Sequence, residues 1–378
     1  MLAAPAAGLG VVDVVSQGGR DSISEGRCYA PCHVGRQPCR RCAGLACGAR
    51  KPARERPFLY GFLYWRGLRA SRAIRAAAWA LVAAGVAAPV VRRRAKLPRA
   101  AVLGASVLAV PALTVATPRT RVRDLALLGL NMWGYLAAYE MPNDDPEALA
   151  RRVRIDYPIA IDRVLGLGVP PTVRLQTDFS DPAHINRFEK LLVFCHWVWF
   201  AVPHGSVVYV LWRAPERFPA AAARMYAVFD LGAVFYWAIP TAPPWYAARH
   251  GRLQDARMRA VRRMMIEYGE QFWGDRWTDL YDVLGGNPLA AMPSLHFATS
   301  LMGAHLLGEV GPVAGAAGWT YALLLGLALV YLGEHYAADL LAGALLAETV
   351  RTQSRRALPG VRALIGRLEA LQRRAAVA

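Results

Sequence analysis

The sequence predicts an all-α protein that crosses a membrane several times. Of its 378 residues, 55% are hydrophobic, and they gather into long apolar runs separated by polar stretches. Soluble domains rarely carry so many separate runs of this kind. The runs are rich in Ala, Leu and Gly and lack the alternation of barrel strands, so helices are the way in which they can satisfy their backbone hydrogen bonds in lipid.

Each run is close to the ~20 residues that cross ~30 Å of hydrocarbon, although the last is short. We predict about eight helices. The last six form one core, and the first two contribute at most two N-terminal spans. The runs lie at 73–91, 100–117, 124–141, 191–212, 223–241, 294–311, 314–333 and 337–352.

This division predicts four regions. They are a disordered basic N-terminal region at 1–71, an apolar hairpin at 72–122, a six-helix membrane domain at 123–352 and a basic cytoplasmic tail at 353–378. Residues 1–71 mix Gly, Arg, Pro and Cys without a period, which is typical of disorder. Residues 1–27 lack the basic start and apolar core of a signal peptide. The absence of Met between Met1 and Met132 leaves open the hypothesis that the natural start is a Val or Leu codon.

Five cysteines within the N-terminal region suggest a zinc site by their spacing. They are Cys28, Cys32, Cys39, Cys42 and Cys47, with His33 among them. The second pair of ligands that usually lies further along the chain is missing. Zinc binding therefore stays the minor interpretation of this cluster.

The distribution of Lys and Arg predicts the orientation in the membrane. Arginines are concentrated from 351 to 374, which places that end in the cytoplasm. Counting back, the loops at 142–190, 242–293 and 334–337 lie outside. One conflict remains, because the basic stretch at 92–96 would also lie outside.

The net charge of +18 fits contact with anionic lipid headgroups. Nucleic acid is the less favoured partner, because the basic residues flank apolar spans. We expect an integral protein of a bacterial plasma membrane. The sequence makes no prediction about oligomeric state.

Two short polar clusters lie at the ends of apolar runs. One is Pro293-Ser294-Leu295-His296 and the other begins at His335 and ends at Asp339. Ionisable residues are costly in lipid, so their presence there indicates function. Two crossings joined by a tight turn would fill the run between the clusters and bring both histidines to one membrane face.

His335 and Asp339 are four residues apart and share one helix face. A carboxylate there can accept the Nδ1 proton of the imidazole and leave Nε2 as a nucleophile or base. Together with His296, this arrangement suits acid–base and nucleophilic work on an ester. The alternative is two capped helix ends with ordinary interfacial histidines.

The same stretches resemble a known family. AMPSLHFATS and VYLGEHYAADLLAG are similar to the second and third signatures of the type-2 phosphatidic acid phosphatase superfamily. Two further stretches resemble sequences of its inositol phosphorylceramide synthase branch, whose members are inositolphosphotransferases. They are PTAPPWY at 240–246 and IDRVLGLGVPPTVRLQ at 161–176. The resemblance covers about 124–352 and implies a six-helix, phosphatase-type membrane core.

By this resemblance, phosphoryl transfer passes through a phosphohistidine. His335 would be the nucleophile, Asp339 would hold its tautomer, and His296 would protonate the leaving alkoxide and then deprotonate the acceptor. The resemblance therefore implies a membrane lipid phosphotransferase or phosphatase that acts on a phospholipid or lipid phosphate. The orientation predicted from Lys and Arg would place its active site at the extracytoplasmic face.

Two departures from the family concern phosphate binding. Ala328-Leu329 replaces the Ser-Arg of the third signature, and the first signature, Lys-x6-Arg-Pro, does not appear in its expected form. Ser294 and the helix N-terminus beside it can bind phosphate oxygens.

Arg249, His250 and Arg252 are the candidate phosphate clamp, with headgroup-facing surface charge as their alternative role. No acidic metal-binding cluster is evident, and we expect neither a metal nor another cofactor.

Two alternatives to a phosphotransferase stay open. The first is a hydrolytic phosphatase for phosphatidic acid or polyprenyl phosphate, in which water attacks the intermediate. The second belongs to another class and is a lipid transporter that moves intact substrate without phosphoryl chemistry.

Overall fold

The computed structural model describes residues 57–181, 183–253, 261–279 and 286–376. Within these ranges the chain forms helices and no strand, and the extended contacts are two isolated bridges that join Arg154, Thr241 and Ala290. The prediction of an all-α, polytopic membrane protein is confirmed. The cysteine cluster of the N-terminal region lies outside the described residues.

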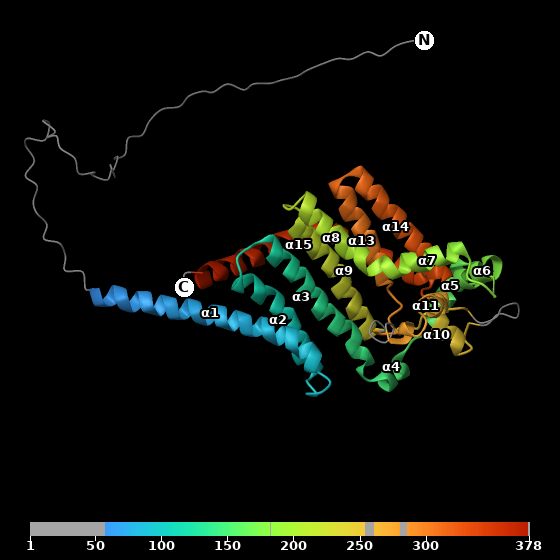
Figure 1. Ribbon diagram of the computed structural model, residues 1–378, viewed down its shortest axis with the longest axis horizontal. Helices are drawn as coiled ribbons and strands as arrows, with labels where there is room; N and C mark the ends of the chain where they lie inside the picture. The colour runs from blue at the N-terminus through green and yellow to red at the C-terminus, as the bar shows by residue number, and fades with distance from the viewer. Residues whose placement is uncertain (1–56, 182, 254–260, 280–285, 377–378) are drawn as a thin grey trace, which may run out of the picture. The chain divides into compact units, whose positions relative to one another are not determined.

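All eight predicted runs are helical (Figure 1). The helices are α1 (Pro57–Val91), α2 (Arg99–Ala116), α3 (Arg121–Glu140), α7 (Arg187–Trp197) continued by η2 (Val198–Phe200) and α8 (Ala201–Arg213), α9 (Phe218–Ala238), α13 (Leu295–Val310), α14 (Pro312–Tyr331) and α15 (Ala337–Ala376). Helix α1 begins at Pro57, within the stretch 1–71 whose composition predicts disorder.

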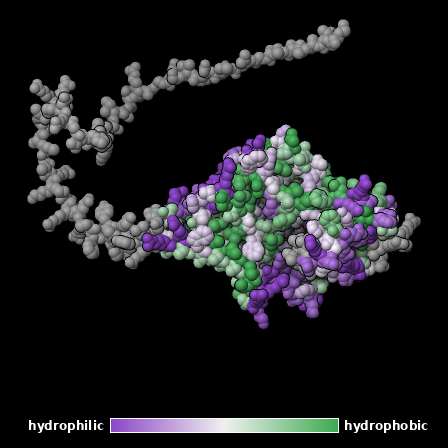
Figure 2. All heavy atoms as spheres, in the orientation of Figure 1, coloured by the Kyte–Doolittle hydropathy of each residue, from purple (hydrophilic) through white to green (hydrophobic). Residues whose placement is uncertain are grey.

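Five of the described helical segments are long and apolar enough to cross a membrane. They are Ser71–Val91, Arg99–Ala116, Arg187–Arg213, Phe218–Ala238 and Pro312–Tyr331. Helix α13 has 16 residues, α3 carries charged residues at both of its ends, and charged residues recur along α15. Figure 2 shows hydrophobic side chains over the middle of the bundle and hydrophilic ones toward its ends, as a bilayer requires.

The basic loop between α1 and α2 lies against acidic residues. Arg92 contacts Glu140 at 3.0 Å and Asp144 at 3.1 Å, and Arg93 contacts Asp144 at 2.7 Å. These acidic residues belong to α3 and to the short helix η1 (Met141–Asp144). The two arginines are therefore neutralised where they lie and do not count as free positive charges in the orientation argument.

Short helices gather at one end of the bundle, toward the right of Figure 1. They are α4 (Pro146–Arg152), α5 (Asp156–Leu165), α6 (Pro171–Phe179), α10 (Pro244–Arg249) and α11 (Met264–Trp273). The apolar side chains of Ile161, Val164 and Leu165 in α5 are exposed, whereas Ile159 and Asp162 are buried. An exposed apolar face on a short helix suits contact with a membrane surface.

Helix α13 lies at the centre of the core and packs against α8, α9, α14 and α15. Two glycines allow the closest approaches to its first turn. A Cβ on Gly343 would lie 2.5 Å from the carbonyl oxygen of Ser294, and one on Gly232 would lie 2.3 Å from Leu295. These contacts fix the start of α13 beside the start of α15, which brings the two polar clusters together.

Candidate active site

The structure brings together the three residues predicted to be catalytic. His296 Nδ1 lies 3.1 Å from His335 Nε2, and His335 Nδ1 lies 3.2 Å from Asp339 Oδ2. His335 and Asp339 are buried. A buried carboxylate accepts the Nδ1 proton, so His335 Nε2 keeps its lone pair and accepts a hydrogen bond from His296.

Backbone contacts in the connection from α14 to α15 hold His335 in place. The N–H groups of Glu334 and His335 both donate to the carbonyl of Leu329, at 3.1 and 3.0 Å. Gly333 has a φ of +80°, where glycine is favoured. Asp339 also accepts from the N–H of Tyr336 at 2.9 Å. The nucleophile candidate is therefore fixed by the turn as well as by its carboxylate.

Ser294 is the N-cap of α13. Its Oγ accepts from the N–H of Phe297 at 3.4 Å, and its own N–H donates to the carbonyl of Asp339 at 2.9 Å. The residue is fully buried and does not line the cavity beside the histidines. Its contacts position the start of α13, and phosphate binding by Ser294 stays a prediction.

A cavity of about 140 Å³ opens beside both histidines. Its polar lining includes His196, Arg263, Asn287 and Glu334. Arg263 makes a two-pronged ion pair with Glu334, at 2.9 and 3.2 Å, and lies 4.0 Å from the ring centre of Trp245. Burial raises the pKa of Glu334, but the charge and hydrogen bonds of Arg263 outweigh burial and lower it overall.

Arg249, His250 and Arg252 do not line this cavity. Arg252 pairs with Asp156 at 2.5 Å and is half exposed, and His250 stacks on Tyr246 with ring centres 4.1 Å apart. Arg249 lies over Trp245 at 5.1 Å. The clamp role of these three residues stays a prediction, and Arg263 is the cation that lines the cavity among the described residues.

His196 of α7 is a third imidazole at the site. Its ring stacks on that of His296 with centres 5.0 Å apart, and Trp199 packs on the same ring at 4.1 Å. His196 lies alone within an apolar run, so no local pattern marks it as a site residue. These aromatic contacts restrict the orientation of His296.

Asp162 of α5 is a site residue that sequence reasoning missed. Its carboxylate accepts from the N–H groups of Ala337 and Ala338, at 3.1 and 2.8 Å, and so caps α15 from another helix. Burial raises the pKa of Asp162 to about 6 against the opposing effect of these donors. The carboxyl group is mainly ionised at neutral pH. Its negative charge is stabilised by the positive N-terminal end of the α15 dipole.

Replacing Asp162 with Ala should lower kcat while leaving KM nearly unchanged. The substitution leaves two buried N–H groups without their acceptor and removes a cap worth about 1–2 kcal/mol. Steady-state kinetics and thermal unfolding of the purified protein measure both effects. Asp162→Asn, which keeps one acceptor oxygen, should recover part of the rate.

Asp156→Ala is the matched control, since Asp156 lies on the same helix and pairs with exposed Arg252. Equal losses in both variants would mean that Asp162 supports α5 in general and does not position the site.

The described residues contain no group of three or more His, Cys, Asp or Glu that could hold a metal ion.

Comparisons with known proteins point to the same part of the chain. The family model of the PAP2 superfamily matches residues 159–350, half of the chain. The inositol phosphorylceramide synthase catalytic subunit aur1 of Schizosaccharomyces pombe is 30% identical over 172 residues, which cover 42% of this chain and 39% of the yeast protein. No solved structure matches. The matched region contains both histidines, Asp339, Asp162 and Arg263.

Proposed function

Because the chain belongs to the PAP2 superfamily, we propose that it is an integral membrane enzyme that transfers a phosphoryl group from a lipid through a phosphohistidine at His335. The observation that carries this proposal is the buried chain of contacts from His296 through His335 to Asp339, beside a cavity that contains a cation. An aligned nucleophile, acid and cation are what phosphoryl transfer requires.

In the first step, His335 Nε2 attacks phosphorus and the bond from phosphorus to the lipid oxygen breaks. His296, protonated beside the bound phosphate, gives its proton to the leaving oxygen. Asp339 accepts the hydrogen bond from Nδ1–H of His335, so the proton stays on that nitrogen. Its negative charge stabilises the positive charge that develops on the ring. In the second step, the acceptor loses its proton to His296, its oxygen attacks phosphorus, and the bond from phosphorus to His335 breaks.

The short contact between the two imidazoles belongs to the resting enzyme. At 3.1 Å there is no space for a phosphorus atom in line between nucleophile and leaving oxygen. Substrate must therefore replace this hydrogen bond and separate the rings. Arg263 at the cavity wall and the N-terminus of α13 would then stabilise the equatorial oxygens.

We place the reaction on the extracytoplasmic face. The arginines from 351 to 374 favour a cytoplasmic C-terminal end. The site lies at the start of α15, whereas these arginines lie in its C-terminal part. The ion pairs of Arg92 and Arg93 with acidic residues lessen the conflict with this orientation, and Arg94 and Lys96 of the same stretch stand against it.

Transfer to an alcohol is favoured over hydrolysis. The fission-yeast relative is named as a synthase, and Glu334 and Asn287 in the cavity lining offer both acceptors and donors to hydroxyl groups. Hydrolysis of a lipid phosphate is the second candidate, because water can attack the same intermediate.

Purified protein in liposomes should break the phosphate ester of a lipid substrate. Phosphatidylinositol and phosphatidic acid would be supplied with and without a long-chain alcohol acceptor, and products would be measured by mass spectrometry and by free phosphate. An acceptor that carries phosphate from phosphatidic acid, or inositol phosphate from phosphatidylinositol, supports transfer. Free phosphate or free inositol phosphate without a modified acceptor supports hydrolysis. Movement of intact labelled lipid between leaflets without bond breakage would instead identify a transporter.

A further inference from the structure

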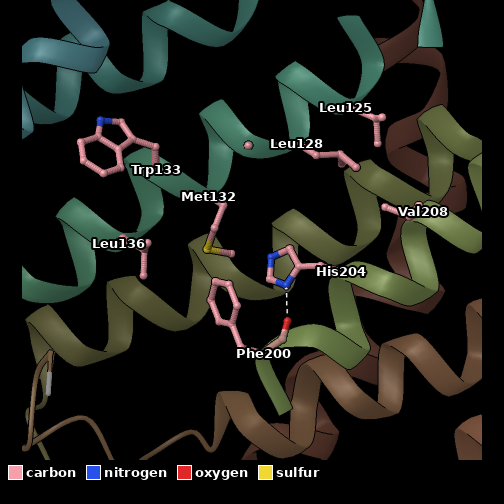
Figure 3. A pocket seen from close by; sticks show the side chains of 9 residues that line it. Leu125, Leu128, Met132, Trp133, Leu136, Phe200, His204 and Val208 are labelled. Carbon is pink, nitrogen blue, oxygen red and sulfur yellow. Dashed lines mark hydrogen bonds between the residues drawn. The ribbon is translucent and has the colours of Figure 1, made fainter. Parts of the chain in front are cut away.

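An apolar groove lies between α3 and α8, both of which pack on α9. Its volume is about 380 Å³, within the ~300–1,000 Å³ of common small-ligand sites. Figure 3 shows Leu128, Met132 and Leu136 of α3 facing Phe200, His204 and Val208 across this space. Among the described residues, no charged side chain lines the groove, so its walls suit hydrocarbon and not a headgroup.

The few polar side-chain atoms of the groove are mostly used within the protein. Trp133 Nε1 donates to the carbonyl of Val86 at 3.1 Å. His204 Nδ1 donates to the carbonyl of Phe200 at 2.7 Å (Figure 3). This contact leaves His204 Nε2 as a lone acceptor nitrogen in an apolar wall.

The groove and the active site meet at the 3-10 turn η2. Trp199 packs on the ring of His296, with centres 4.1 Å apart. The next residue, Phe200, lines the groove and packs on Trp199 at 5.9 Å. Two consecutive residues of η2 therefore link the two sites. Trp199 contacts the imidazole of His296, and Phe200 lines the apolar groove.

The groove is open to the surface that lipid would occupy. Leu125, Phe200 and Val208 of its rim are more than two-fifths exposed, and Phe200 and Val208 belong to the membrane-spanning segment Arg187–Arg213. A chain can enter from the side without leaving hydrocarbon. The only surroundings with this chemistry and access are the acyl chains of lipids.

We propose that this groove binds a hydrocarbon chain of the phosphorylated lipid substrate while the phosphate occupies the cavity at His296 and His335. The inference rests on the proposed function. The groove would then determine which chain length the enzyme prefers in its substrate, because each methylene outside the groove loses contact with the groove walls.

Gly129 provides a direct test. It lies in the groove wall, and a Cβ added there would meet nothing within 4 Å, so Gly129→Leu can occupy the groove without moving the backbone. Gly205→Leu in α8 is the matched control, because its Cβ also meets nothing and Gly205 does not line the groove. Kinetics would compare lipid phosphates with short and long chains.

Gly129→Leu should raise KM for the long-chain substrate by about tenfold, as the loss of a few buried methylenes predicts, with little change for the short-chain one. Gly205→Leu should match the wild type for both. Equal chain-length profiles in all three proteins would overturn the groove proposal and leave the proposed function intact.

A binding assay separates the two proposals further. A lipid phosphate with a photoreactive diazirine in its chain should label peptides of α3 and α8 in wild type and less in Gly129→Leu. If labelling follows this pattern but wild type turns over no lipid, the groove proposal holds and the proposed function fails. Equal labelling by a neutral diacyl lipid of the same chains would indicate bulk bilayer contact only and would also overturn the proposal.

Discussion

Replacing His335 with Asn should lower phosphoryl transfer by at least about 10³-fold, as loss of an activated nucleophile does. The Asn amide can still donate to Asp339, which is fully buried, so the carboxylate keeps a partner and the fold is preserved. His335→Ala should be equally inactive but less stable, because that buried carboxylate loses the imidazole and keeps the backbone N–H of Tyr336 as its donor.

The measurement is trapping of the phosphoenzyme together with steady-state rates. Wild type should yield a phosphoryl adduct that is labile in acid and stable in alkali, as phosphohistidine is, and His335→Asn should yield none. His305→Asn is the control, since His305 pairs with Glu348 and does not line the cavity. Normal turnover by His335→Asn would refute the assignment of His335 as the nucleophile.

His296→Ala adds a test of the second role. This variant should lose nearly all activity on a lipid alkoxide, which needs a proton to leave. With p-nitrophenyl phosphate, whose leaving group needs no acid, the first step should recover and the adduct at His335 should accumulate.

Replacing Arg263 with Gln should lower kcat/KM by about 10²–10³-fold, the usual effect of losing one charge that stabilises the transition state. The side chain lines the cavity and holds its position through Glu334 and Trp245. Vanadate, which imitates the phosphoryl transition state, should inhibit this variant less than the wild type by a similar factor.

Loss of Arg263 also leaves Glu334 buried without its partner, which destabilises the protein. The double variant Arg263→Gln with Glu334→Gln removes both charges and should recover thermal stability without recovering activity. Arg252→Gln is the control from the sequence-predicted clamp, since Arg252 pairs with Asp156 at the surface. If Arg252→Gln were the impaired enzyme and Arg263→Gln the active one, the clamp would lie just after α10.

Features set by neighbouring residues were predictable from the sequence. The apolar runs predicted all eight long helices, because length and composition alone decide whether a helix suits lipid. The pairing of His335 with Asp339 follows from one helical turn, and the approach of His296 follows from the turn between two helices.

Features that depend on contacts between distant segments were not predictable in the same way. Arg263 reaches the cavity just before α11 begins, and Asp162 reaches α15 from a helix 175 residues earlier. Neither has a local pattern that separates it from the many other charges of these loops. The clamp candidates Arg249 and Arg252 lie close in sequence to PPWY, whereas the fold turns Arg252 toward Asp156.

Helix α5 connects two environments that are usually independent. Its outward side chains Ile161 and Val164 are exposed and apolar, and its inward Asp162 holds the start of the helix that carries Asp339. We therefore expect contact of α5 with the lipid surface and alignment of the proposed reacting groups to depend on the same short segment. Solubilisation that loosens this segment should slow turnover before the bundle itself unfolds, so the bilayer acts as a structural support for the chemistry as well as the source of its substrate.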